Sequence, residues 1–150
     1  MTATYEQAKG DMFTLVKAAR DAESTMAGLY TNWQGVPQNP GDKPSQDEEW
    51  IQVSIRHDQT GSRQASLACH HGRRRWRREG SLFIQCFAPL QSGGLKRAIT
   101  MASIFRDAIQ ASTGTPHGVW FRNPAATEGD TEKNWEYALA SARFTYDEVK

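Results

Sequence analysis

The chain is poor in aliphatic side chains. Leu, Ile, Val and Phe together account for 24 of its 150 residues, so a domain of this size should have a thin core. Fifteen aromatic residues, five of them Trp, replace part of the missing volume. This composition favours a subunit that completes its burial against neighbouring copies.

Cysteines and long apolar runs are also scarce. Cys69 and Cys86 are the two cysteines, too few for the disulfide framework of a small secreted domain, so we expect free thiols. No run of 18 apolar residues and no charged-then-apolar amino terminus occurs, which argues against a membrane span or a Sec-type signal peptide. We therefore expect a soluble, intracellular protein with one domain over residues 1–150.

The net charge of +1 conceals an uneven distribution of charge. Residues 51–80 carry seven arginines against Asp58 and Glu79, a net charge of +5, whereas the rest of the chain carries −4. The basic residues singled out here, with the Trp that interrupts them, are Arg63, Arg73, Arg74, Arg75, Trp76, Arg77 and Arg78. The candidate acidic counterparts are Asp47, Glu48, Glu49, Glu128, Asp130 and Glu132. The basic segment of one subunit could meet an acidic segment of another.

Hydrophobic periodicity predicts two helices. The first covers residues 4–27, begins with a capping box and stops at Gly28, and the second runs from Gly93–Gly94 to Gly114. Residues 31–49 contain three prolines and two glycines, so they should form an extended loop.

Alternating polar and apolar residues predict four strands, at 50–56, 81–88, 119–122 and 135–146. The second is apolar on both faces and should be central. Asn123–Pro124 should end the third strand, with a turn region through Gly129, and residues 57–80 should form a basic hairpin. The order α-β-β-α-β-β predicts an α/β (α+β) fold, a mainly antiparallel four-stranded sheet with two helices on one face. The helices should cover the face that carries the alanines of the last strand.

Motifs for catalysis or metal binding are weak. Cys69-His70-His71 offers ligand atoms, but the spacing lacks the second ligand pair of a zinc site, and Cys69 lacks the setting of a catalytic nucleophile. Gly93–Gly94 lacks the remaining residues of a phosphate-binding loop. We expect no enzymatic activity, no cofactor and no metal, and leave Cys69-His70-His71 without a role.

The run Arg73–Arg78 has two interpretations. Guanidinium groups bind phosphates and Trp76 could stack on bases, which favours a nucleic-acid-binding module. Alternatively, the arginines pair with acidic groups across a subunit boundary. In a strand, the odd-numbered arginines would lie on one face, and Arg74, Trp76 and Arg78 on the other.

Several segments, taken in order, resemble the tail terminator-like proteins of long-tailed (lambda-type) bacteriophages. They are Trp50–Arg56, Arg63–Leu67, Gly72–Gly80, Phe83–Pro89, Val119–Pro124 and Trp135–Asp147. The similarity covers nearly the whole chain, but it does not include the insertion Cys69-His70-His71, which stays unassigned.

The resemblance implies a structural virion protein that forms a homohexameric ring at the head-proximal end of the tail tube. Such a ring stops tube polymerisation and provides the docking surface for the head-neck connector. The implied partners are further copies of the chain, the major tail tube protein and the head-neck connector protein. DNA would pass through the ring without sequence-specific binding, and no membrane is involved. The implied location is the tail-neck junction of the virion, after assembly in the host cytoplasm.

The resemblance also implies roles for two tryptophans and for the basic hairpin. Trp33 and Trp120 become candidate aromatics of the contacts between subunits. The basic hairpin would lie in the lumen of the ring or between subunits, and we prefer the second, since strong phosphate binding would retard DNA passage. Another neck or tail-completion ring protein is an alternative, and a DNA-binding module using Arg73–Arg78 is an alternative of a different class.

Overall fold

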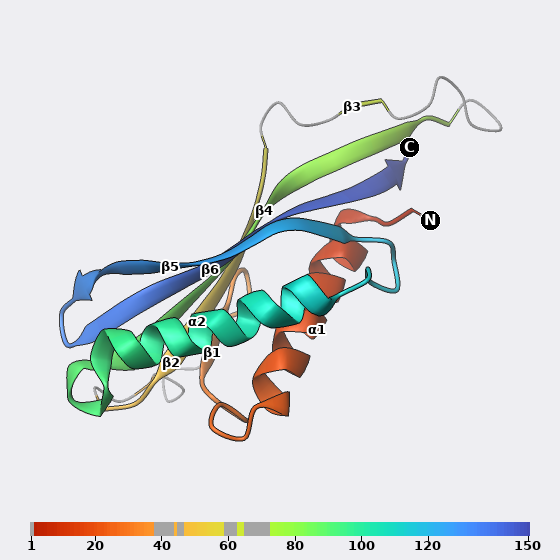
Figure 1. The fold of residues 1–150 in the computed structure, drawn as a ribbon. Coiled ribbons are helices and arrows are strands. Elements are labelled where there is room, and N and C mark those ends of the chain that lie inside the picture. The colour runs from red at the N-terminus through yellow and green to blue at the C-terminus, as the bar shows by residue number, and fades with distance from the viewer. Residues whose placement is uncertain (1, 38–43, 45–46, 59–62, 65–72) are drawn as a thin grey trace.

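The computed structural model describes residues 2–37, 44, 47–58, 63–64 and 73–150. The chain begins with helix α1 (Tyr5–Ala22) and strands β1 (Thr31–Trp33), β2 (Trp50–His57), β3 (Arg63–Gln64) and β4 (Arg75–Pro89). The short 3-10 turn η2 (Leu90–Ser92) leads into helix α2 (Gly94–Ala111), which is followed by strands β5 (Trp120–Glu132) and β6 (Trp135–Val149). The two helices lie on the same side of a long twisted sheet (Figure 1).

The sheet confirms the α+β class but has more strands than the four expected. Its six strands follow the order β1-β2-β4-β6-β5, with β3 paired to β4 outside that path. The pairings are antiparallel except for the parallel contact between β1 and β2. The expected order α-β-β-α-β-β therefore lacked β1 and β3, which are too short to show an alternating pattern.

The central position expected for the second predicted strand is confirmed, because β4 lies between β2 and β6. Its start was predicted too late: β4 begins at Arg75 and pairs with β6 from Arg75↔Val149 to Pro89↔Trp135. Within the basic hairpin predicted over 57–80, Arg63–Gln64 pair antiparallel with Trp76–Arg77. The bounds of that segment overlap the long strands, since His57 belongs to β2 and Arg75–Gly80 belong to β4.

Strand β5 corrects the expectation that Asn123–Pro124 ends the third strand. The strand continues to Glu132, with register shifts after Arg122 and after Glu128. A bulge leaves residues out of the ladder, which accommodates a proline that has no N–H to donate. The turn region expected through Gly129 is therefore strand, and the reversal of the chain occurs at residues 133–134.

The helices were predicted with small errors at their ends. Helix α1 has the expected capping box between Thr4 and Gln7, but it ends at Ala22 and not at residue 27. The loop predicted over 31–49 begins with β1, because Thr31–Trp33 pair with the edge of β2. Helix α2 starts after Gly93, whose φ of +102° favours glycine.

The core lies between the helices and one face of the sheet. Its fully buried side chains include Met12 and Val16 from α1, Phe105 from α2, and Ile84 and Phe144 from the sheet. The alanines of β6 lie on this face, as expected: they are Ala138, Ala140 and Ala142. Their small side chains let α2 approach the sheet closely. None of the helices in the described part of the chain combines the length and apolar character needed to cross a membrane.

Candidate assembly surface

The arginine-rich segment is the end of the central strand that extends beyond the helices. Arg75–Arg78 pair with β6 on one side, and on the other β3 pairs with this segment through Arg63↔Arg77 and Gln64↔Trp76. Arg73 and Arg74 are exposed, and the backbone of Arg74 pairs with that of Lys150. The chain termini lie at this same end of the molecule (Figure 1).

The alternation of the arginines is confirmed by their partners. Arg75 and Arg77 both bind the carboxylate of Asp147, which is 8% exposed, and the Arg77 Nε lies 3.2 Å from Asp147 Oδ1. Arg78, from the other face, donates to Glu148 at 2.8 Å. These acceptors belong to β6 of the same chain and were not among the acidic counterparts expected. The adjacent Asp-Glu pair near the carboxyl terminus was the sequence signal that could have suggested them.

A groove borders Arg75 and Arg77. Its volume is about 510 Å³, and its remaining lining residues are Thr113, Gly114, Thr115, Gly118, Trp120, Thr145, Tyr146 and Asp147. Trp120 is 62% exposed, the largest exposure among the large hydrophobic side chains described. The Nε of Arg75 is buried and finds no acceptor among the described residues. This wall therefore offers an aromatic surface and hydrogen-bond donors, a combination typical of protein contact sites.

The loop that forms the rim of the groove is fixed to α1. Asp11 accepts hydrogen bonds from the backbone N–H of His117 at 2.8 Å and from its ring at 2.7 Å. Burial alone would raise the pKa of Asp11, but hydrogen bonds from Thr115 and His117 lower it. The carboxylate thus holds the loop between α2 and β5 in place.

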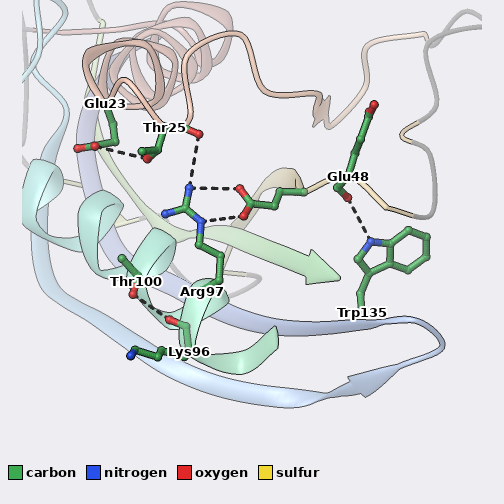
Figure 2. Close-up of polar contacts among 8 residues, drawn as sticks. Glu23, Thr25, Glu48, Lys96, Arg97, Thr100 and Trp135 are labelled. Atoms are coloured by element: carbon green, nitrogen blue, oxygen red, sulfur yellow. Dashed lines mark hydrogen bonds and ion pairs between the residues drawn. The ribbon is translucent and has the colours of Figure 1, made fainter. Parts of the chain in front are cut away.

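The acidic counterparts lie at the opposite end of the sheet. Asp47, Glu48, Glu128 and Asp130 are exposed, and Glu132 is the last residue of β5. Glu49 is bound within the chain, because Arg97 of α2 donates to its two oxygens at 2.8 and 3.2 Å. Figure 2 shows the same guanidinium reaching the carbonyl of Thr25, and Trp135 donating to the carbonyl of Glu48. Among the described side chains, Glu49 forms an ion pair, whereas Asp47, Glu48, Glu128 and Asp130 form none.

The aromatic candidates have different settings. Trp33 packs on Phe13 with ring centroids 5.0 Å apart and contributes to its own subunit's core, whereas Trp120 faces solvent. Trp76, within the basic segment, is half-buried.

A second aromatic group, which the sequence analysis did not single out, surrounds the start of β2. Trp50 stacks on Phe87 at 4.1 Å, and Trp135 meets the edge of Trp50 at 6.2 Å. The Nε1 of Trp50 is buried and has no acceptor among the described residues.

Two further pairs of described side chains have shifted pKa values: His57 with Tyr146, and Asp58 with Arg143. Burial lowers the pKa of His57, with the positive charge of Arg78 adding to the effect, and burial raises the pKa of Tyr146 to about 12. The two side chains share a hydrogen bond of 2.8 Å. A hydrogen bond from Arg143 lowers the pKa of Asp58.

The structure describes one of the two cysteines of the chain. Cys86 is a buried free thiol, and its burial raises its pKa. Within the described ranges, no three His, Cys, Asp or Glu side chains gather in a geometry that could hold a metal ion. Cys69-His70-His71 lies outside the described residues.

No protein-family model and no curated protein sequence matches the chain. Solved structures do share its fold. One, a protein whose name states no function, has a TM-score of 0.67 and 13% sequence identity over 96% of both chains. Another comes from the virion of a native gene transfer agent particle, with a TM-score of 0.53 and 16% identity over 96% of this chain and 99% of that chain. At these identities, the matches establish a common fold.

Proposed function

We propose that the protein is a structural, non-enzymatic subunit of a phage-type virion and that it forms the ring that terminates the tail tube. The observation that carries the proposal is the separation of charge along one sheet. The exposed arginines lie at one end of β4 and the exposed carboxylates near the other end. Opposite charges on distant surfaces of one molecule can meet only between copies, in a head-to-tail contact.

The fold supports a virion role. A chain of the gene transfer agent virion shares it over nearly its whole length. The segments that resemble tail terminators include most of β2, most of β4 and most of β6, which form the centre of the sheet. A head-to-tail contact repeated around an axis closes into a ring, and the expected ring has six members.

Termination needs two unlike surfaces on that ring. One surface must match the last ring of the major tail tube protein, and the other must accept the head-neck connector protein while failing to template a further tube subunit. The site of action is then the tail-neck junction of the virion. Complementary surfaces perform this work without bond-forming chemistry.

The ion pairs of the basic strand favour an assembly role over tight DNA binding. Asp147 and Glu148 neutralise part of the charge of Arg75, Arg77 and Arg78, and a less positive lumen lets DNA pass without being retained. The DNA-binding alternative rests on Arg73 and Arg74, which stay exposed. It predicts binding of duplex DNA that weakens steeply as salt increases.

Electron microscopy of the purified protein mixed with tail tubes of the same virus tests the proposal. We expect rings of six-fold symmetry at one end of each tube, and tubes that no longer elongate when tube protein is added. Decoration along the tube, or tubes that keep growing, overturns the terminator role. Rings that bind the isolated connector but ignore the tubes favour another neck or tail-completion protein.

A further inference from the structure

The groove beside Trp120 has unused binding capacity. Arg75 and Arg77 share the single carboxylate of Asp147, so this wall retains one excess positive charge. The Arg75 Nε is a buried donor without an acceptor among the described residues. The indole of Trp120 adds an apolar surface that is 62% exposed. The groove thus suits a chain segment that brings carboxylates and some apolar area.

The acidic end of β5 has complementary properties. Glu128 and Asp130 are exposed, and neither forms an ion pair with another described residue. Gly129, between them, packs closely against the ring of Tyr137: a Cβ atom at Gly129 would lie 2.2 Å from that ring. These two exposed carboxylates are therefore available as hydrogen-bond acceptors for a neighbouring molecule.

The two features cannot meet within one molecule. Glu128 follows Trp120 by eight residues on the same strand, a separation of about 26 Å at the rise of a β-strand. Figure 1 shows the β5–β6 hairpin at the end of the sheet far from β3 and the termini. The occupant of the groove must therefore come from another molecule.

We propose that the Trp120 groove receives the Glu128–Asp130 segment of a second copy of this chain. The inference rests on the proposed function and deepens it by naming the contact between ring neighbours. The acidic segment at 47–49 is a weaker fit, because Glu49 is already bound to Arg97 and the carbonyl of Glu48 to Trp135. The contact joins two different surfaces, so it propagates around a ring and does not stop at a dimer.

Cysteine cross-linking tests this contact directly. Thr113 lines the groove and Thr127 precedes Glu128, and both side chains are exposed. In a Cys69→Ser background, the variants Thr113→Cys and Thr127→Cys are mixed and treated with a short bis-maleimide, with and without tail tubes. We expect a cross-linked dimer that contains one copy of each variant and no product from either variant alone. The double variant should give a ladder of multimers that ends at the size of the ring.

Other results overturn the proposal. Dimers of Thr113→Cys alone indicate a two-fold contact through the groove, and no mixed product under either condition removes the contact. Tubes that are capped by a protein lacking the cross-link leave the terminator role intact and remove this inference only. A cross-linked ring that does not bind tubes supports this contact and overturns the terminator role.

A charge reversal provides an independent measurement. Glu128→Arg with Asp130→Arg should lower the fraction of assembled protein at least tenfold in sedimentation velocity, while the melting temperature stays unchanged. The control is Glu23→Arg, which reverses a partly exposed carboxylate at the C-cap of α1. If the double variant assembles like the control, the proposal is wrong. It is equally wrong if Trp120→Ala weakens binding of a DNA oligonucleotide while assembly persists, since the groove then serves nucleic acid.

Discussion

Arg77 and Asp147 are direct partners in the register of β4 and β6, and they form an ion pair 3.2 Å long. The same carboxylate binds Arg75. Two arginines on one face of a strand therefore depend on one carboxylate of the neighbouring strand. This relationship fixes the end of the central strand, where the sheet extends beyond the helices.

Asp147→Asn should lower the free energy of unfolding by about 1–2 kcal/mol. The substitution removes the negative charge and one of the two acceptor oxygens that Arg75 and Arg77 share, and the partial exposure of the guanidinium groups to water limits the loss. Urea denaturation monitored by circular dichroism measures the change. Asp107→Asn is the control, because Asp107 is 64% exposed beside Arg106 and should change stability by less than about 0.5 kcal/mol. Similar losses in both variants contradict the structural role of Asp147.

Gly80→Ala should destabilise the protein by about 3 kcal/mol or more, since the added carbon has no room. At Gly80 it would lie 2.3 Å from the carbonyl oxygen of Arg56 and 2.5 Å from the ring of Phe144. Gly10→Ala is the matched control, because it is exposed in α1 and its Cβ would meet nothing within 4 Å. That variant should gain about 0.5–1 kcal/mol from helix propensity. The measurement is the melting temperature of both variants. A Gly80→Ala protein that is as stable as the parent contradicts the close packing around Gly80.

Stability should fall when the solution is acidified below the ordinary pKa of histidine, because of His57. Burial lowers the pKa of this ring and Arg78 adds repulsion, while Asp58 and Glu148 oppose the effect. A lowered histidine pKa means that the folded state prefers the neutral ring. Its contribution is fully present above about pH 6.5 and is lost as the pH falls toward the folded-state pKa.

His57→Gln tests this dependence, since an amide can keep a hydrogen bond to Tyr146 without titrating. The measurement is the free energy of unfolding at about pH 7.5 and about pH 5 in both proteins. The variant should lose less stability between the two values than the parent does. Parallel profiles would show that other groups cause the acid sensitivity.

Arg97 and Glu49 should be energetically coupled by about 1 kcal/mol, because their ion pair is bidentate and both side chains are about four-fifths buried. A double-mutant cycle of Arg97→Gln and Glu49→Gln measures the coupling through urea denaturation. Arg97→Lys should recover little of the interaction, since an ammonium group cannot match both oxygens. Additive losses in the cycle would show that the pair in Figure 2 contributes no stability.

The parts of the fold that could be predicted are those with a repeated pattern. The alternation of Ile51, Val53 and Ile55 predicts β2, and the alanines of β6 predict the face that the helices cover. Strands β1 and β3 could not be found in this way, because two or three residues contain no period and depend on the strand beside them. Strand β5 continues past Pro124 because a bulge accommodates the proline. Local turn propensity ends the strand at this point, because it does not take the pairing with β6 into account.

The candidate site was predictable only in part, for a related reason. The alternating faces of Arg75 and Arg78 follow from strand geometry alone. Their acceptors, Asp147 and Glu148, follow only from the register between β4 and β6, about 70 residues apart in the sequence. The groove requires one more long-range contact, from Asp11 to the loop at His117.

Trp120 and Trp33 should respond differently to truncation, although both were candidates for contacts between subunits. Trp33→Ala should cost about 1–3 kcal/mol, because its ring packs on Phe13 against the core of its own chain. Trp120→Ala should change the stability of the single chain by less than about 0.5 kcal/mol, since the side chain is 62% exposed. It should nevertheless weaken assembly strongly, as loss of an aromatic anchor does at protein interfaces. Urea denaturation of dilute protein and sedimentation velocity of concentrated protein separate the two effects. A Trp120→Ala variant with clearly reduced stability would mean that the indole stabilises its own subunit and does not form the contact with a neighbouring copy.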